Sequence, residues 1–203
     1  MDKISQFWNW FAANNKAYTF LEDVDEEMKE SLLNGLVEQL HEYCENLYFE
    51  IGGMPGEDVE LIITAEGDTD YFDKVEELIS NAPSISGWQL IAFKPAMPDD
   101  FVSSWDDLEL NTEDMWFRPI KNNSTTKLEI TIYLKNYDLI KDNEILDPLI
   151  FKMLDTILGE KSFAKDIGSV DFDLQPDEPG ENGLYPIIQL PEYIKKYKSQ
   201  LRH

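Results

Sequence analysis

Histidine and cysteine are nearly absent from this chain of 203 residues, which contains only His41, His203 and Cys44. One cysteine allows no intrachain disulfide, which is compatible with a reducing compartment. A Ser-His-Asp or Cys-His arrangement would have to use His41, because we expect the terminal His203 to be frayed. No Gly-x-Ser-x-Gly sequence occurs, so the chain shows no recognisable nucleophile motif.

Long apolar runs are also missing. Runs such as Leu61-Ile62-Ile63 and Leu90-Ile91-Ala92-Phe93 are only long enough for strands, whereas a helix that crosses a bilayer needs ~20 apolar residues. Residues 1–6 contain no basic region followed by an apolar stretch, so we expect no secretion signal. These absences predict a soluble, cytoplasmic protein that does not bind membranes.

The sequence lacks a complete set of metal ligands. Glu38-x-x-His41 has the spacing of di-metal carboxylate sites, but those sites need a second such motif and no other usable histidine is present. Four acids fit the first, third, fifth and last ligand positions of a calcium loop: Glu66, Asp68, Asp70 and Glu77. That loop also needs a glycine where this chain has Tyr71. We therefore expect no metal and no other cofactor.

Anion-binding motifs are equally poor. Arg118 is the only arginine outside the C-terminal tail, which disfavours arginine-based recognition of anions. Glu66-Gly67-Asp68 occupies the strand-to-helix turn where a phosphate-binding loop would lie. Acids at that position repel phosphate, so nucleotide binding is disfavoured.

What the chain has in excess is negative charge. The formal net charge is −24. Residues 1–117 carry 5 Lys and Arg against 27 Asp and Glu, a net charge of −22, and residues 118–203 carry 12 against 14, a net charge of −2. Such a surface repels nucleic acids and anionic membranes and attracts basic partners. It also keeps a protein soluble without any partner, and that interpretation stays open.

Hydrophobic residues make up 42% of the chain and aromatic residues 12%, enough to form a core. Apolar periodicity and turn residues predict a series of short elements. We expect helices over 4–13, 25–46, 71–81 and 192–200, and one that begins with Asp147 as its cap and ends at Gly159. We expect strands over 47–51, 59–65, 88–93, 127–134 and 170–174, and a hairpin of 108–110 with 115–120.

Several local predictions are more specific. Phe7, Trp8 and Phe11 fall on one face of the first helix, whereas Trp10 points elsewhere. Asp70 is expected to cap the helix over 71–81. Residues 99–113 are acidic and are expected to be irregular.

The helix over 25–46 has the clearest apolar stripe. Its members are Leu32, Leu33, Leu36, Val37, Leu40, Tyr43, Cys44 and Leu47. We expect Leu33, Leu36, Leu40 and Cys44 to face the core, and Cys44 to be a buried structural cysteine rather than a nucleophile.

A strand–strand–helix–strand pattern occurs over 47–93 and again over about 115–174. Because a strand–helix–strand crossover normally makes its two strands parallel, each unit predicts a mixed sheet with helices packed on it. The predicted class is α+β. We expect an acidic N-terminal unit over residues 1–98 and a C-terminal unit over 99–203, sharing one sheet or core.

Several packing and turn residues resemble those of a group of uncharacterised bacterial proteins. They are Phe7-Trp8-x-Trp10-Phe11, Leu61 to Gly67, Ala82-Pro83 with Trp88, Ala92-Phe93-Lys94-Pro95 and Leu154-Asp155-x-x-Leu158-Gly159-Glu160. The resemblance covers most of the chain. The group has no assigned activity, so the resemblance implies no functional residue.

The missing catalytic repertoire and the acidic region favour a non-enzymatic binding or regulatory protein. We expect a basic protein partner, no nucleic acid and no membrane. Trp10 and Trp105 are the candidate anchors because both lie off the predicted apolar stripes. The acids of the candidate partner-binding surface are Asp99, Asp100, Asp106 and Asp107.

Two other functions stay open. A hydrolase could use a pair of carboxylates, with a divalent metal recruited by the acidic stretch. A nucleic-acid mimic, such as a nuclease inhibitor or immunity-type protein, could use surface acids in place of phosphates. A hydrolase needs a few acids with raised pKa values in a pocket, whereas a mimic needs acids in a regular surface line.

The charge predicts that the protein does not bind duplex DNA at moderate salt, because phosphate contacts require Lys and Arg side chains. An electrophoretic mobility shift assay at micromolar protein checks this expectation. A shift that disappears as salt is added would contradict it.

Overall fold

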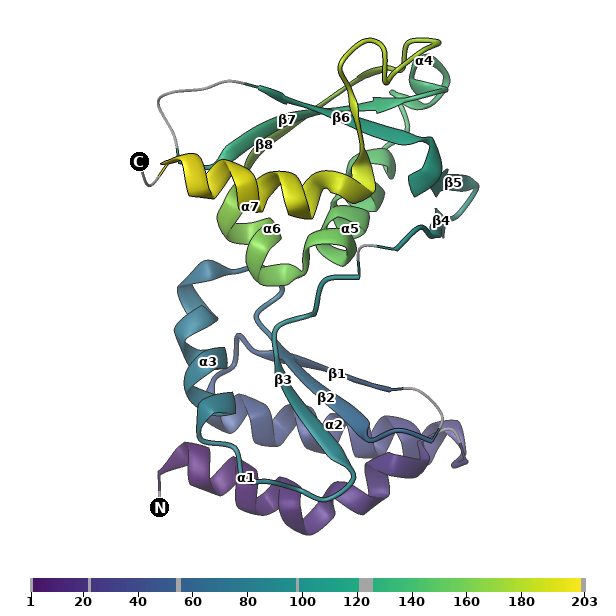
Figure 1. Ribbon diagram of the computed structural model, residues 1–203. Coiled ribbons are helices and arrows are strands. Elements are labelled where there is room, and N and C mark those ends of the chain that lie inside the picture. The colour runs from purple at the N-terminus through teal and green to yellow at the C-terminus, as the bar shows by residue number, and fades with distance from the viewer. Residues whose placement is uncertain (1, 22, 54–55, 98, 121–125, 202–203) are drawn as a thin grey trace. The chain divides into compact units, whose positions relative to one another are not determined.

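A computed structural model describes the chain except for residues 1, 22, 54–55, 98, 121–125 and 202–203 (Figure 1). The fold is α+β, as the sequence predicted. The chain forms two compact units, unit 1 over Met1–Lys94 and unit 2 over Pro95–His203. The division therefore falls slightly before the boundary after residue 98 that the sequence suggested. None of the described helices combines the length and apolar composition needed to cross a bilayer.

Unit 1 contains a three-stranded mixed sheet in the order β1 (Tyr48–Gly52), β2 (Val59–Thr64), β3 (Trp88–Ala92). β1 and β2 are antiparallel and β2 and β3 are parallel. The helix α3 (Phe72–Ser80) makes the crossover between the parallel strands. The strand–strand–helix–strand prediction for this region is confirmed.

The aromatic helix α1 (Lys3–Asn14) supplies much of the core of unit 1. Phe7, Trp8 and Phe11 are buried, as predicted, and Trp10 is not. The Trp8 indole donates a hydrogen bond of 2.9 Å to the carbonyl of Leu78 in α3. Phe11 packs edge-on against Trp88 with ring centroids 5.0 Å apart. Aromatic contacts therefore join α1 to both α3 and the sheet. A 3-10 helix, η1 (Asn15–Phe20), follows α1.

The helix α2 (Glu26–Tyr43) begins as predicted, because the Asp25 side chain accepts a hydrogen bond from the Met28 N–H. Leu36 and Leu40 are fully buried. Leu33 and Cys44 are only half-buried, so the prediction that they face the core is wrong. The helix ends at Tyr43, and the extended backbone of Cys44 takes its side chain off the helical stripe. Leu33 lies on the same side of the helix as Leu40 but two turns earlier, where it lines an open groove instead of the core.

The start of α3 also differs from the prediction. A 3-10 turn, η2 (Thr69–Tyr71), precedes the helix. The Asp68 side chain accepts from the Asp70 N–H at 3.0 Å and caps this turn. Asp70 is therefore not the cap of α3, which has no side-chain cap.

Unit 2 contains a four-stranded sheet in the order β8 (Ile167–Leu174), β7 (Leu128–Leu134), β6 (Met115–Ile120), β9 (Tyr185–Pro186). β6 and β7 are antiparallel and β7 and β8 are parallel. Three helices lie in the crossover: α4 (Tyr137–Ile140), α5 (Leu146–Leu158) and α6 (Glu160–Asp166). The second strand–strand–helix–strand prediction is thus confirmed. A 3-10 turn, η4 (Ile187–Gln189), and the helix α7 (Leu190–Leu201) follow β9.

Among the described strands, no sheet contains strands from both units. The expectation of one shared sheet is therefore corrected. Each sheet already has its own crossover helix, so each can cover one face and form its own core.

The core of unit 2 is centred on α5. Every residue of the predicted apolar face of this helix is buried: Leu149, Ile150, Met153, Leu154, Ile157 and Leu158. They form one cluster with Met115 and Phe117 of β6 and Ile130 and Ile132 of β7. The helix begins at Leu146, so Asp147 is not its cap.

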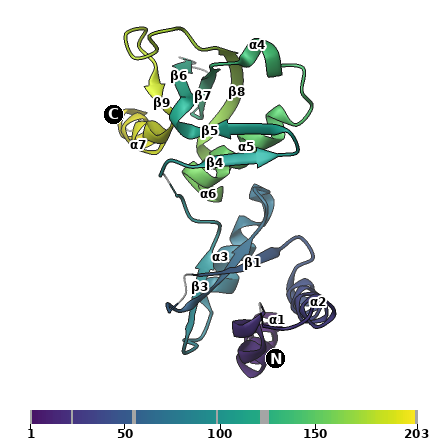
Figure 2. The same ribbon diagram turned by 90° about the vertical axis from the view of Figure 1, so that its right-hand side faces the viewer.

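The other described sheet of unit 2 is the hairpin of β4 (Val102–Trp105) and β5 (Leu108–Asn111) (Figure 2). Residues 99–113 are therefore not irregular, and 108–110 does not pair with 115–120. The reason lies in the 3-10 turn η3 (Thr112–Asp114), which the Asn111 side chain caps. This turn directs the chain from β5 into a different sheet.

We expect Leu40→Ala to lower the free energy of unfolding by ~2–5 kcal/mol, because it leaves a cavity at a fully buried site. Leu33→Ala is the matched control, since it makes the same truncation at a half-buried position of the same helix. Urea denaturation followed by circular dichroism measures both changes. A loss in Leu40→Ala of less than about 0.5 kcal/mol, which is the range of surface substitutions, would show that Leu40 is not a core residue.

Candidate functional site

The β4–β5 hairpin brings together three of the six residues that the sequence selected. Trp105 is paired with Leu108 at the end of the ladder, and Asp106 and Asp107 form the two-residue turn between them. Asp106 has a φ of 52°, a left-handed conformation that aspartate tolerates better than most residues. Trp105, Asp106 and Asp107 therefore make up the hairpin tip.

The Trp105 side chain is only partly packed. It stands opposite the buried Leu108, yet 48% of it is exposed, and Val102 at the other end of the strand is 54% exposed. Tryptophan contributes the largest apolar area of any side chain and is enriched at the energetic centres of interfaces. The hairpin tip therefore presents a large apolar group to solvent.

The segment that carries this tryptophan contains formal side-chain charges of one sign only. Residues 95–117 contain seven Asp and Glu and no Lys or Arg. Asp114 forms an ion pair with Lys135, which lies outside that segment. Within the described part of the chain, no ion pair neutralises Asp106, Asp107 or Glu109. The exposed ring thus belongs to a segment of strongly negative net charge.

Asp99 and Asp100 are exposed but lie at the other end of the hairpin. The Thr112 hydroxyl donates to Asp100 at 3.2 Å and accepts from the Phe101 N–H at 2.9 Å. This contact fixes the start of β4 against the end of β5. Since each strand residue advances ~3.4 Å, these two acids are about one strand length from the tip.

Trp10 belongs to unit 1 and is half-buried. Its ring lies against Tyr18 with centroids 6.3 Å apart. The six residues selected from the sequence therefore belong to two different units. Of these, Trp105, Asp106 and Asp107 lie together at the hairpin tip.

The sequence contained a signal for this hairpin that the expectation of an irregular segment overlooked. Val102-Ser103-Ser104-Trp105 and Leu108-Glu109-Leu110 are two short strand-like runs separated by two aspartates. Two such runs joined by two turn residues are typical of a hairpin.

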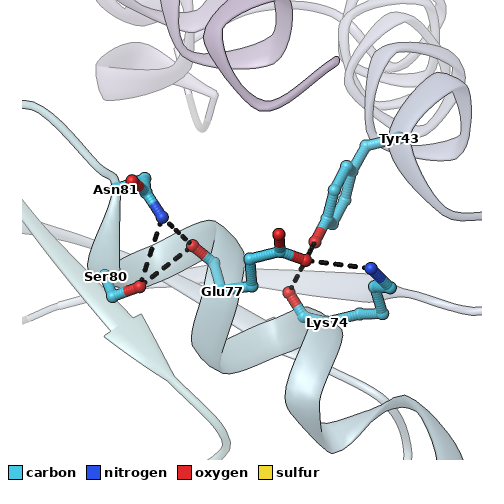
Figure 3. A network of polar contacts seen from close by, with 5 residues as sticks. All are labelled: Tyr43, Lys74, Glu77, Ser80 and Asn81. Atoms are coloured by element: carbon cyan, nitrogen blue, oxygen red, sulfur yellow. Dashed lines mark hydrogen bonds and ion pairs between the residues drawn. The ribbon is translucent and has the colours of Figure 1, made fainter. Parts of the chain in front are cut away.

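A polar network joins the end of α2 to α3 (Figure 3). The Tyr43 hydroxyl lies 2.9 Å from Glu77 Oε2 and 3.2 Å from the Lys74 carbonyl. Lys74 Nζ donates to the same Glu77 oxygen at 2.9 Å. The Glu77 carbonyl accepts from Ser80 and Asn81. One carboxylate thus connects both helices.

The electrostatics of the network favour a structural role. Burial, and then the hydrogen bond and charge of Glu77, raise the pKa of Tyr43 far above its usual range. The hydrogen bonds from Lys74 and Tyr43 lower the pKa of Glu77. A catalytic tyrosine base or carboxylic acid needs the opposite shifts.

His41 and Arg118, two side chains with catalytic potential, both contact other parts of the fold. His41 Nε2 is 3.1 Å from the carbonyl of Leu47. Arg118 donates to the carbonyl of Asn182 at 2.9 Å, and its guanidinium lies over the Tyr133 ring. Across the described residues, no three His, Cys, Asp or Glu side chains gather closely enough to hold a metal ion.

We expect Glu77→Gln to lower the pKa of Tyr43 without restoring the ordinary value, because burial, the larger cause, is unchanged. Asp73→Asn, an exposed neighbour on α3, is the control and should leave that pKa unchanged. Carbon-13 NMR titration of labelled tyrosine measures it. Since the folded-state pKa lies above the unfolded value of ~10, stability should also fall as pH rises above ~10. A Tyr43 that titrates normally in the unmodified chain would contradict the network.

Comparison of the chain with protein-family models, with curated proteins and with solved structures finds no match. The resemblance to uncharacterised bacterial proteins therefore stays a prediction.

Proposed function

We propose that this protein is a non-enzymatic binding protein that contacts a basic protein partner through the tip of the β4–β5 hairpin. The observation that carries the proposal is the half-exposed Trp105 next to Asp106 and Asp107. Its segment, 95–117, has seven acids and no basic residue. The single, half-buried cysteine fits a reducing compartment, so the cytoplasm is the compartment we propose.

The two parts of the tip have different tasks. Unpaired surface charges mostly raise the association rate, because they steer an oppositely charged partner toward the surface. Burial of the tryptophan ring stabilises the complex once it has formed, and hot-spot residues of this kind contribute about 2 kcal/mol or more. The acids thus govern how fast the complex forms and Trp105 governs how slowly it dissociates.

The sign of the charge selects the partner. Acids around the tip repel the phosphates of nucleic acids, which bind through Lys and Arg. Both units are acidic, with net charges of −15 for residues 1–94 and −9 for residues 95–203. A partner that approaches either unit therefore needs a basic surface.

The test uses the full chain as bait in an extract of its source cells, followed by binding kinetics with the captured protein. We expect Asp106→Lys with Asp107→Lys to slow association on the order of tenfold at low salt. The control, Asp171→Lys with Asp173→Lys, makes the same charge change on two exposed acids of β8. Trp105→Ala should raise the dissociation rate.

Salt provides the second arm of this test. The Debye length is ~10 Å at 0.1 M salt and shortens as salt is added, so the difference between the two double variants should shrink. Failure to capture a basic protein, or a partner whose association rate ignores salt, would contradict the proposal. Equal effects of the two double variants would show that the hairpin is not the contact.

A further inference from the structure

A groove of about 590 Å³ lies in unit 1 between α2 and β1. Its apolar lining consists of Leu33 and Val37 of α2, Phe49 and Ile51 of β1, and Leu21 and Leu47. Leu33, Val37, Phe49 and Ile51 are half-buried rather than buried. The residues that the sequence assigned to the core at this end of α2 thus line an open groove.

The groove adjoins an open sheet edge. β1 pairs with β2 on one side, and no described strand pairs with its other side. The backbone N–H and C=O groups of such an edge are a template for another strand. Gly52, at the end of β1, has open space where a side chain would lie, so a neighbouring chain can approach closely there.

In unit 2, the edge strand that corresponds to β1 is paired with a further strand. β1 and β6 hold equivalent places, since each is the antiparallel partner of the strand that enters the parallel crossover. In unit 2, β9 pairs antiparallel with the outer side of β6, at Trp116 and Phe117. The fold therefore accepts one more strand at this position, and unit 1 supplies none among its described residues.

The negative charge beside the groove favours a basic occupant. Glu27, Glu30 and Glu38 line a shallow depression on the adjoining face of α2. Residues three and four apart share one side of a helix, so these acids form a row alongside Leu33 and Val37. The rim also carries Lys29, His41 and Glu50, which leaves the acidic row as the dominant charge.

We propose that the α2–β1 groove binds an extended, basic segment of a partner protein, which adds to the outer edge of β1 as a fourth strand. In this binding mode the backbone hydrogen bonds supply affinity and alternate side chains enter the neighbouring pockets. Successive side chains of a strand point to opposite faces. Apolar side chains of the segment enter the groove, and the Lys and Arg side chains of the same segment reach the acidic row.

A second copy of this chain is the less suitable occupant. Each copy has a net charge of −24, and β1 itself contributes Glu50, so two such edges would meet with like charges. This groove belongs to unit 1, and strand addition there is a separate property from binding at the hairpin of unit 2.

The probe is a short fluorescent peptide in which lysine and valine alternate, titrated with the full chain and followed by anisotropy. We expect Glu30→Lys to weaken binding by about fivefold or more. Glu42→Lys is the matched control: it makes the same charge change at an exposed position of α2 that does not line the groove, and should change affinity by less than about twofold. Trp105→Ala should leave peptide affinity unchanged.

Two further measurements separate strand addition from general attraction to an acidic protein. Hydrogen exchange of the β1 amides should slow when the peptide binds, and a peptide of the same composition plus a central proline should bind more weakly. Val37→Arg should abolish peptide binding, because the larger side chain fills the groove. If that variant does not fold, Glu30→Lys, a change at an exposed residue, still tests whether the peptide binds beside the acidic row. Equal weakening by Glu30→Lys and Glu42→Lys, or β1 amides that exchange equally fast with and without peptide, would overturn the proposal.

Discussion

Parallel pairing of β2 with β3 and of β7 with β8 is the constraint on which the rest of both units depends. A parallel pair cannot be closed by a hairpin, so the chain has to cross over with a helix. The crossover helices supply the apolar surface that each sheet needs: α3 in unit 1 and α5 in unit 2 bury their apolar faces. The same strand–strand–helix–strand order thus yields the same mixed sheet twice.

The units differ in what they add to this shared arrangement. Unit 1 adds α1 and α2 before the sheet, and unit 2 adds the β4–β5 hairpin before it and β9 and α7 after it. These additions decide which surfaces are open. β9 covers the outer edge of β6, whereas the equivalent edge of β1 is uncovered among the described strands. The hairpin places Trp105 and two aspartates on a short turn outside the core of unit 2.

Charge follows a different division from the fold. The sequence separates into a strongly acidic part and a nearly neutral part after residue 117. Along the chain, unit 1 ends at Lys94 and unit 2 begins at Pro95, and each unit has a negative net charge. The reason is that surface charges do not direct chain folding, so their distribution need not respect unit boundaries. The acids on which the two proposals rest are instead those next to apolar groups, at the hairpin tip and along α2.

Local periodicity was sufficient to determine α1, α5 and both crossovers, because a helix or a buried strand repeats its apolar positions within a few residues. Negative charge and a tryptophan off the apolar stripes, rather than periodicity, singled out Trp105, Asp106 and Asp107, together with Trp10, Asp99 and Asp100. Two short strand-like runs joined by two aspartates already indicated the hairpin whose tip Trp105, Asp106 and Asp107 form. Tertiary structure alone decided that Trp10 lies in another unit and that Leu33 lines a groove. Those outcomes depend on which segment pairs with which edge and on where α2 ends. Such choices are made by contacts between residues distant in the chain, which no short window of sequence contains.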